Sequence, residues 1–467
     1  MKIRLIASAG FIAYMLIAHT GSADQSSPVV ISNYHVATHF TVPANPYGLP
    51  TPDQLNYAVF TRYRYNPEPS QIKAILVLMP GLFGGAADFD RMAKTIVQMG
   101  KGDIEVWAVD RRSVLLDDLT GMREAWNKRD PSIALGYYFS GATVNGKTYA
   151  GSLLTTPASI SYMSEWGIDM ILRDLNMIIS LVPRQYRKTN VFLGGHSLGA
   201  FIAQDYAAYD FGNDPTTTTN AGFNNIAGVI LLDGGGSNLF HTTPTRGAYL
   251  TGTGLSFTAS GTPYNLPSVY KLETTPSYIT VAGLMGRVMG PDFLKMFAFA
   301  QIEGMLAMIE PHQLSTLLQC SAFQPLASFL LGNTRFKATN RAMLGFALDR
   351  NFNPINIMSA TLGSANGPLT STTNPFMPGA AISQPTDRGT LTYTWNSTGH
   401  ITNISDVAAA LSNTYTVMTE QYFPSRLLLD SLALADYGPT QTTDWRYRQG
   451  IHVIHTHQMD APVIAFG

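Results

Sequence analysis

Residues 190–199 read NVFLGGHSLG, and this stretch carries the strongest indication of the fold. The apolar run before the glycines is too short for a helix and predicts a strand buried on both faces. Gly195-His196-Ser197-Leu198-Gly199 follows at once, and a helix is plausible from Gly199 through Tyr209. A serine on a tight turn between strand and helix is the setting of a nucleophile elbow, in which only glycine tolerates the crowding on either side. The pentapeptide is common by chance, so this context gives it weight.

The same alternation continues on both sides of the elbow. Continuous apolar runs predict buried strands, and apolar residues at i, i+3, i+4 and i+7 predict helices packed on a sheet. We expect two leading antiparallel strands at 34–42 and 58–65, further strands at 74–79, 104–109, 190–193, 226–232 and 461–467, and helices at 89–97 and 168–179. Strand, crossover helix and strand in this order predict an α/β fold with a doubly wound, mostly parallel sheet.

The pattern changes between Gly234 and about Tyr437, where helical stretches such as 293–309 and 404–418 replace the alternation. We interpret residues 237–440 as a large, mainly helical cap or lid insertion into a core formed by residues 24–236, with 441–467 returning to the core. Methionines in this region could line an adaptable apolar pocket or could simply be core: Met285, Met289, Met296, Met305 and Met308.

The N-terminus predicts export. Lys2 and Arg4 precede an apolar run at 5–18, and small residues follow before Asp24, so residues 1–23 resemble a cleavable signal peptide. The alternative is an uncleaved anchor, but the run is shorter than the ~20 residues of a spanning helix. We therefore expect a periplasmic or secreted protein without an integral membrane span after cleavage.

Composition narrows the functional classes. Charged residues make up only 13% of the 467 residues, and 30 basic side chains nearly balance 31 acidic ones. Nucleic-acid binding is disfavoured because it relies on clustered Lys and Arg. Cys320 is the single cysteine, so no internal disulfide can form; it could be a nucleophile, but without an adjacent base or Gly-rich turn it is better interpreted as a buried apolar residue.

From about Tyr34 to Gly236 the chain resembles the α/β-hydrolases of the serine esterase and lipase type. The resemblance rests on three motifs in the family's order: the Gly-rich loop at 79–85, the Val-Asp-Arg-Arg turn at 109–112, and the elbow. It implies that Ser197 is the nucleophile and that the backbone N–H groups of Leu198 and Leu82, or alternatively Phe83, form the oxyanion hole. The loop could otherwise be a simple tight turn, and it lacks the Gly-Lys-Ser/Thr ending of a phosphate-binding loop.

Asp233 follows the strand after the elbow and is our candidate catalytic acid. It could instead stabilise the glycine turn. Most of the family carries the acid after the next strand, which is 461–467 here, so the acid could also lie beyond Gly467. Asp110 closes an earlier strand and is interpreted as structural.

The general base is the weak point, because the family's histidine follows the last strand and the sequence ends at Gly467. His196 points away from the nucleophile in the elbow geometry, which suggests packing. His452, His455 and His457 precede the terminal strand and should lie at the opposite edge of the sheet. His241, His312 and His400 lie in the expected cap. The simplest explanation is a missing C-terminal segment that carries the histidine.

These features predict hydrolysis of a small-molecule or lipid-like ester with an apolar part through an acyl-Ser197 intermediate. No metal site of the His-Glu-x-x-His or Cys-x-x-Cys kind occurs in the sequence, and no cofactor is implied. Two alternatives remain: a non-catalytic binding protein on the same fold, and an acyltransferase or amidase that uses the same elbow.

Overall fold

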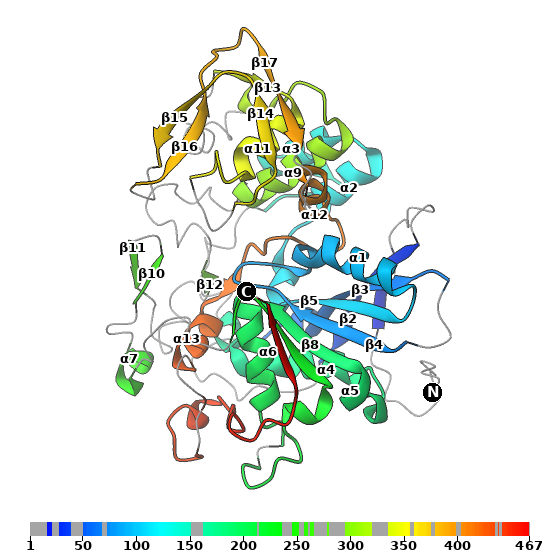
Figure 1. Cartoon of the computed structure of the whole chain (residues 1–467), viewed down its shortest axis with the longest axis vertical. Coiled ribbons are helices and arrows are strands. Elements are labelled where there is room, and N and C mark those ends of the chain that lie inside the picture. The colour runs from blue at the N-terminus through cyan, green and yellow to red at the C-terminus, as the bar shows by residue number, and fades with distance from the viewer. Residues whose placement is uncertain are drawn as a thin grey trace.

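The computed structural model describes residues 16–20, 28–38, 50–67, 72–150, 162–212, 214–235, 245–251, 256–259, 262–265, 278–279, 295–319, 335–354, 359–374, 379–397, 403–434, 438 and 441–466. A large twisted sheet with its helices occupies the lower part of the molecule, and a second group of helices and small sheets lies above it (Figure 1).

The large sheet has eight strands in the order β1-β2-β3-β5-β4-β8-β9-β19. The first three strands and the β3–β5 pair are antiparallel, whereas β5, β4, β8, β9 and β19 run parallel. The strands are β1 (Leu16–Thr20), β2 (Val29–Ala37), β3 (Tyr57–Tyr65), β4 (Ala74–Met79), β5 (Ile104–Asp110), β8 (Val191–His196), β9 (Gly228–Leu232) and β19 (Val463–Phe466). This is the mostly parallel sheet that the sequence predicts.

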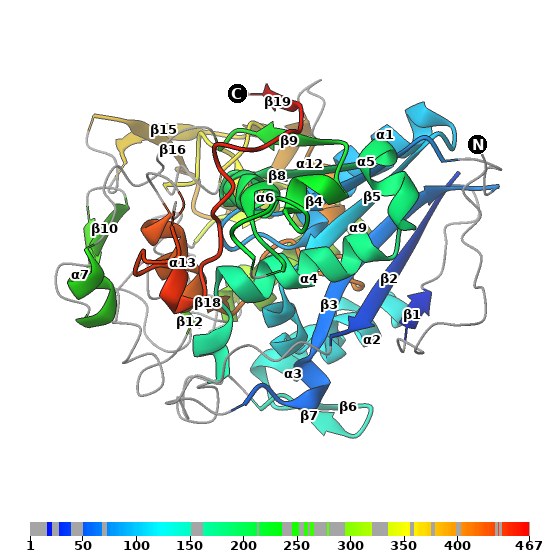
Figure 2. The ribbon, with the colours of Figure 1, turned by 90° about the horizontal axis from the view of Figure 1, so that it is seen from below.

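Helices cover both faces of the sheet because successive strand residues point to opposite sides. On β4, Val77 and Met79 face α4 (Ile168–Ser180), α6 (Leu198–Ala208) and α13 (Ser425–Ala433), and we call the apolar cluster on this face the first core. Leu78, between them, packs on the other face with α1 (Asp90–Gly100). Figure 2 shows α4 and α6 together on one side, with β1 and β19 at opposite ends of the sheet. A short helix, α5 (Arg184–Asn190), leads into β8.

A second apolar cluster, which we call the second core, joins segments that are far apart in the sequence. Phe139 stacks on Phe299 with ring centroids 4.0 Å apart, which ties the region after β5 to the region after β9. Its helices are α2 (Thr120–Lys128), α3 (Pro131–Phe139), α9 (Lys295–Ile309), α11 (Asn340–Leu348) and α12 (Ile404–Leu411), with the small sheet of β13 (Lys337–Ala338), β14 (Gly363–Asn366) and β17 (Thr392–Ser397) beside them. Figure 1 shows this group in its upper half.

Short elements complete the described chain. They are β6 (Thr143–Val144), β7 (Lys147–Thr148), α7 (Arg246–Thr251), β10 (Ser256–Ala259), β11 (Thr262–Asn265), β12 (Tyr278–Ile279), β15 (Leu369–Thr373), β16 (Ala381–Pro385) and β18 (Phe423–Pro424). Within its described residues, the region expected to be mainly helical therefore contains three two-stranded sheets and one three-stranded sheet as well as helices.

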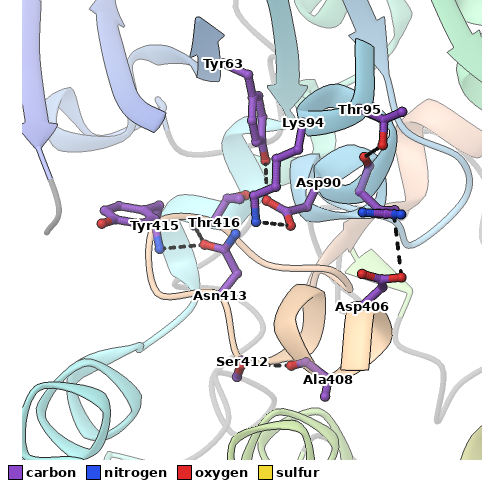
Figure 3. A network of polar contacts seen from close by, with 11 residues as sticks. Tyr63, Asp90, Lys94, Thr95, Asp406, Ala408, Ser412, Asn413, Tyr415 and Thr416 are labelled. Atoms are coloured by element: carbon purple, nitrogen blue, oxygen red, sulfur yellow. Dashed lines mark hydrogen bonds and ion pairs between the residues drawn. The ribbon is translucent and has the colours of Figure 1, made fainter. Parts of the chain in front are cut away.

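The second core meets the other face of the sheet where α1 and α12 lie next to each other (Figure 3). Arg91 on α1 forms an ion pair with Asp406 on α12 at 3.5 Å. Asp90 accepts hydrogen bonds from the Tyr63 hydroxyl at 3.1 Å and from Lys94 at 2.6 Å, which fixes the start of α1 against β3. The chain that leaves α12 is thereby guided toward the carboxyl ends of the parallel strands.

Two expected boundaries were wrong. The first full strand of the sheet begins at Val29 and not at residue 34, because its pairing with β3 runs from Val29 to Ala37. The helix expected at 404–418 ends at Leu411, since the following residues make contacts with the sheet that a continued helix would break. The terminal strand spans Val463–Phe466 within the expected 461–467. Of the expected signal peptide, only the backbone of Leu16–Thr20 is described, where it forms β1.

Candidate active site

Ser197 lies on the turn between β8 and α6, with φ of 51° and ψ of −118°. A positive φ is uncommon for a non-glycine residue and is held only where the surroundings impose it. The Ser197 N–H donates to the Leu232 carbonyl at 3.0 Å, and its own carbonyl accepts from the Ala200 N–H at 3.0 Å. The backbone of the candidate nucleophile is thus fixed from β9 and from α6, and its side chain is half-buried.

The glycines around Ser197 are required by space. A Cβ added at Gly195 would collide with the backbone of Gly199, and one added at Gly199 would collide with the Met79 carbonyl. Gly81 is also close, since a Cβ there would lie 3.3 Å from the Ser197 Cβ. The loop after β4 therefore runs directly beside the elbow.

Three backbone N–H groups in this region have no hydrogen-bond acceptor among the described residues. Leu198 is the first residue of α6, so its N–H has no acceptor within the helix and lies at the positive end of the helix dipole. Within the described part of the chain, the N–H groups of Leu82 and Phe83 also have no hydrogen-bond acceptor. Both loop residues are half-buried. The structure therefore leaves the expected donors at Leu82 and Leu198 available to an oxyanion, together with the alternative at Phe83.

Arg111 holds the loop from behind. Its guanidinium donates to three loop carbonyls, those of Pro80 at 3.2 Å, Gly81 at 2.6 Å and Gly84 at 3.0 Å. It also pairs with Glu420 at 2.7 Å, and the two side chains are only 1% and 0% exposed. Burial raises the pKa of Glu420, although Arg111 and the Ser113 hydroxyl oppose the rise.

The segment before Glu420 pairs with the loop along its backbone. The Gly85 N–H donates to the Met418 carbonyl at 2.9 Å, the Ala87 N–H to Val417 at 3.2 Å, and the Glu420 N–H to the Phe83 carbonyl at 2.9 Å. The loop is consequently held on two sides, by Arg111 and by residues 417–420.

Asp110 has the structural place expected of it. Its carboxylate accepts the Ala86 N–H at 2.7 Å and a hydrogen bond from the Thr416 hydroxyl, which joins the loop after β4 to the segment after α12. Burial raises the pKa of Asp110 to about 7, against the effect of these two donors.

Asp233 lies beside the elbow but is exposed. Its neighbours contact the Ser197 backbone: Leu232 accepts the Ser197 N–H, and a Cβ at Gly234 would lie 2.8 Å from the Ser197 Cα. Asp233 itself has φ of 45°, and its N–H donates to Phe466 at 2.7 Å. Within the described residues its carboxylate has no hydrogen-bond partner, so Asp233 lies near Ser197 without a contact to a histidine.

The histidines that could act as a general base lie in different parts of the molecule. His452 and His455 lie near the far end of α6, where the His455 N–H donates to the Ala208 carbonyl at 2.9 Å, so they are remote from Ser197 as expected. His196 was expected to pack in the interior, but it is exposed, and its Nδ1 would lie 3.2 Å from a Cβ at Gly81. His312 is exposed beyond α9, whereas His241 and His400 lie outside the described residues, as does Cys320. No described histidine is hydrogen-bonded to the Ser197 hydroxyl.

Glu420 is the site residue that sequence reasoning missed. It is 309 positions from Arg111, and nothing in its local sequence indicates a partner in the Val-Asp-Arg-Arg turn. Of the expected pocket methionines, Met305 is fully buried in the second core. The side chains of Met285, Met289 and Met296 lie outside the described part.

Across the described ranges, no three His, Cys, Asp or Glu side chains are grouped so that they could hold a metal ion. No described helix combines the length and apolar character needed to cross a membrane.

No family model matches the sequence, and no curated protein does. The solved structures that it resembles include a candidate lipase from Sulfolobus solfataricus, at 12% identity and a TM-score of 0.34, over 65% of this chain and 64% of that one. A thermostable carboxyl esterase from Bacillus coagulans has 18% identity and a TM-score of 0.21 over 40% and 43% of the two chains. The fluorophosphonate-binding serine hydrolase F of Staphylococcus aureus has 15% identity and a TM-score of 0.23 over 47% and 64%. The chain spans less than two thirds of the length of each of these proteins.

Proposed function

We propose that this chain is a serine hydrolase that cleaves a carboxylic ester with an apolar part through an acyl-Ser197 intermediate. The observation that carries the proposal is the strained backbone of Ser197 beside unused N–H groups at Leu82 and Leu198. Holding a serine at positive φ costs on the order of 1–3 kcal/mol, and such strain persists where it serves a function. Structural roles alone do not explain a serine, rather than a glycine, at this position.

In the proposed reaction the Ser197 Oγ attacks the ester carbonyl carbon while a general base accepts its proton. The tetrahedral oxyanion accepts hydrogen bonds from the Leu82 and Leu198 N–H groups, which need no reorganisation because the surrounding backbone is fixed. The bond to the alcohol oxygen then breaks, the alcohol leaves with a proton, and water hydrolyses the acyl-serine. Asp233 is our candidate for the acid that orients the base.

The test is covalent labelling of the full chain with a fluorophosphonate probe and hydrolysis of short p-nitrophenyl esters. We expect Ser197 to be the labelled residue and Ser197→Ala to lose both labelling and turnover. Ser180→Ala, which removes a hydroxyl that bonds only to the Asn176 carbonyl in α4, is the matched control and should behave as the wild type. A folded wild-type chain that is not labelled at Ser197 would refute the proposal.

The second candidate is a non-catalytic binding protein on the same fold. It is favoured by the lack of a hydrogen bond between the Ser197 hydroxyl and any described histidine. The labelling experiment separates the two functions, because a binding protein would retain a folded elbow without a reactive serine. An acyltransferase or amidase would be labelled as well, and it would be recognised by faster turnover with an added alcohol acceptor or with an amide substrate.

We further propose that the protein is exported and that the second core acts as a cap over the site. Lys2, Arg4 and the apolar run at 5–18 support export. The cap is supported by the position of the second core above the sheet (Figure 1) and by the descent of residues 416–420 from α12 to the loop. Mass spectrometry of the mature N-terminus tests export, and a chain that begins at Met1 or Lys2 in the cell interior would contradict it.

A further inference from the structure

We propose that Arg111 and Glu420 are positioning residues that aim the Leu82 N–H at the oxyanion, an inference that rests on the proposed function. The two side chains lie in the interior at 1% and 0% exposure; Arg111 donates to the loop carbonyls, and Glu420 pairs with Arg111. They act through the loop backbone and do not contact substrate.

One peptide unit links Arg111 to the Leu82 N–H. The Gly81 carbonyl and the Leu82 N–H belong to the same planar trans peptide and point in opposite directions. Arg111 holds the Gly81 oxygen at 2.6 Å. Fixing that oxygen against the guanidinium therefore directs the Leu82 N–H away from Arg111. Gly81 itself lies beside Ser197, since its added Cβ would be 3.3 Å from the Ser197 Cβ.

Glu420 fixes the guanidinium in turn. Arg111 Nε donates to one carboxylate oxygen at 2.7 Å, and the Ser113 hydroxyl donates to the other at 2.6 Å. The remaining Arg111 nitrogens are then directed at the carbonyls of Pro80, Gly81 and Gly84. A planar guanidinium with five donors in a rigid fork can make all these bonds at once, whereas a lysine ammonium has three donors at a single point.

Phe423 also holds Arg111 and the loop together through aromatic contacts. Arg111 lies over the Phe423 ring at 5.2 Å, and Phe423 packs edge-on against Phe83 at 5.2 Å. Phe83 has φ of 60°, so the loop is held in a conformation that its own sequence does not favour. The contacts of Arg111, Glu420 and Phe423 are what maintain this conformation, and with it the direction of the Leu82 N–H.

The test compares Arg111→Lys and Glu420→Gln with Arg112→Lys as the matched control. Arg112 is equally buried and next in sequence, and its guanidinium forms a two-point pair with Asp174 on α4. Activity is measured as kcat and KM for a p-nitrophenyl ester per folded molecule, with folding checked by circular dichroism and gel filtration. Amide hydrogen exchange of residues 81–87 is measured in parallel.

We expect Arg111→Lys and Glu420→Gln to lower kcat by roughly tenfold or more with KM nearly unchanged, because an oxyanion donor acts in the transition state. Exchange at Gly84, Gly85 and Ala87, whose N–H groups are bonded in the structure, should become faster. Arg112→Lys should lower stability without changing kcat per folded molecule. If Arg111→Lys does not fold, Glu420→Gln and Ser113→Ala carry the test, the latter with a smaller fall in kcat.

The outcomes separate the two proposals. An active wild type whose positioning variants keep the wild-type kcat and loop exchange would overturn the inference and leave the proposed function intact. A wild type that is neither labelled at Ser197 nor active would overturn the proposed function, and with it this role for Arg111.

Discussion

At the residue scale, the space around Ser197 sets the limits of the site. Gly81 is the nearest loop residue, and a side chain there must share room with the Ser197 Cβ and with His196. The separations of 3.3 Å and 3.2 Å are tighter than ordinary van der Waals contact, so a methyl group would displace either the loop or the nucleophile by a few tenths of an ångström. Catalysis depends on such placements more than folding does.

Gly81→Ala should therefore lower kcat and the labelling rate by about tenfold while it changes stability by about 1 kcal/mol or less. The matched control is Gly136→Ala in α3, where an added Cβ would also lie 3.3 Å from its neighbour, Ala142, but far from the elbow. The measurements are ester turnover and urea unfolding of both variants. Equal activity in the two variants would show that the loop is not beside the reacting serine.

The role of Asp233 can be tested by removing its charge alone. Asn tolerates a positive φ as Asp does, so Asp233→Asn should keep the turn intact and remove only the charge. If Asp233 is the acid, kcat should fall by roughly 10²–10⁴-fold, since an uncharged partner cannot stabilise the imidazolium. Asp103→Asn, at the amino end of β5, removes a carboxylate from the opposite edge of the same sheet and should leave kcat unchanged. An unchanged kcat in Asp233→Asn would assign this residue to the turn.

At the element scale, the strands that could be predicted are those buried on both faces. The runs at 74–79 and 104–109 became β4 and β5 almost residue for residue. A continuous apolar run of that length is too short for a helix and fits a strand buried on both faces of a sheet. The end of α12 could not be predicted. The apolar pattern continues past Leu411, but Thr416 and Glu420 hydrogen-bond to Asp110 and Arg111, and these tertiary contacts outweigh local helix preference.

Helix α9 buries a carboxyl group, that of Glu303, which should make stability depend on pH. This side chain is buried in the second core, one carboxylate oxygen has no partner among the described residues, and burial raises its pKa to about 8. In the unfolded chain the group has its ordinary value of 4.5. The folded state therefore binds more protons between these pH values, so stability should fall as pH rises from about 4.5 to 8 and then level off.

Glu303→Gln should remove that pH dependence. Because each pKa unit corresponds to about 1.4 kcal/mol, the variant should be more stable than the wild type at pH 8, on the order of a few kcal/mol, and should lose this advantage near pH 4.5. Thermal unfolding across this pH range is the measurement. Glu310→Gln, which removes a carboxylate just beyond the end of α9 at a half-buried position, is the control and should keep the wild-type slope. A wild-type slope in Glu303→Gln would contradict the raised pKa.

At the scale of the whole molecule, the site depends on chain segments that sequence reasoning cannot bring together. The elbow and the loop after β4 were predictable because each follows a buried strand, and parallel strands end at one edge of the sheet. The segment 417–420 reaches the same loop from α12, after more than 300 residues, and tertiary contacts with the loop and with Arg111 hold it there. The second core thus contributes to the site by placing Glu420 and its neighbours.

This arrangement predicts that a destabilising substitution in the second core unfolds residues 417–420 and the loop after β4 more readily than it unfolds the large sheet. Phe299→Ala removes a buried ring that stacks on Phe139, and Leu172→Ala removes a buried side chain of α4 in the first core; each should cost roughly 2–5 kcal/mol. In Phe299→Ala, hydrogen exchange should accelerate in α3, α9, α12 and residues 417–420 while β4 and β8 stay protected. On heating, ester turnover should then be lost at a lower temperature than the temperature at which circular dichroism shows the sheet to unfold.

Leu172→Ala is the comparison, because a lesion beneath the sheet should lower protection in β4 and β8 and bring the loss of activity and the loss of sheet structure together. If Phe299→Ala instead loses activity and sheet structure in one coincident transition, with β4 as exposed as α9, then the two cores unfold as one unit. In that case the second core stabilises the site only by stabilising the entire fold, and the segment from α12 to Glu420 does not transmit its own disorder to the loop.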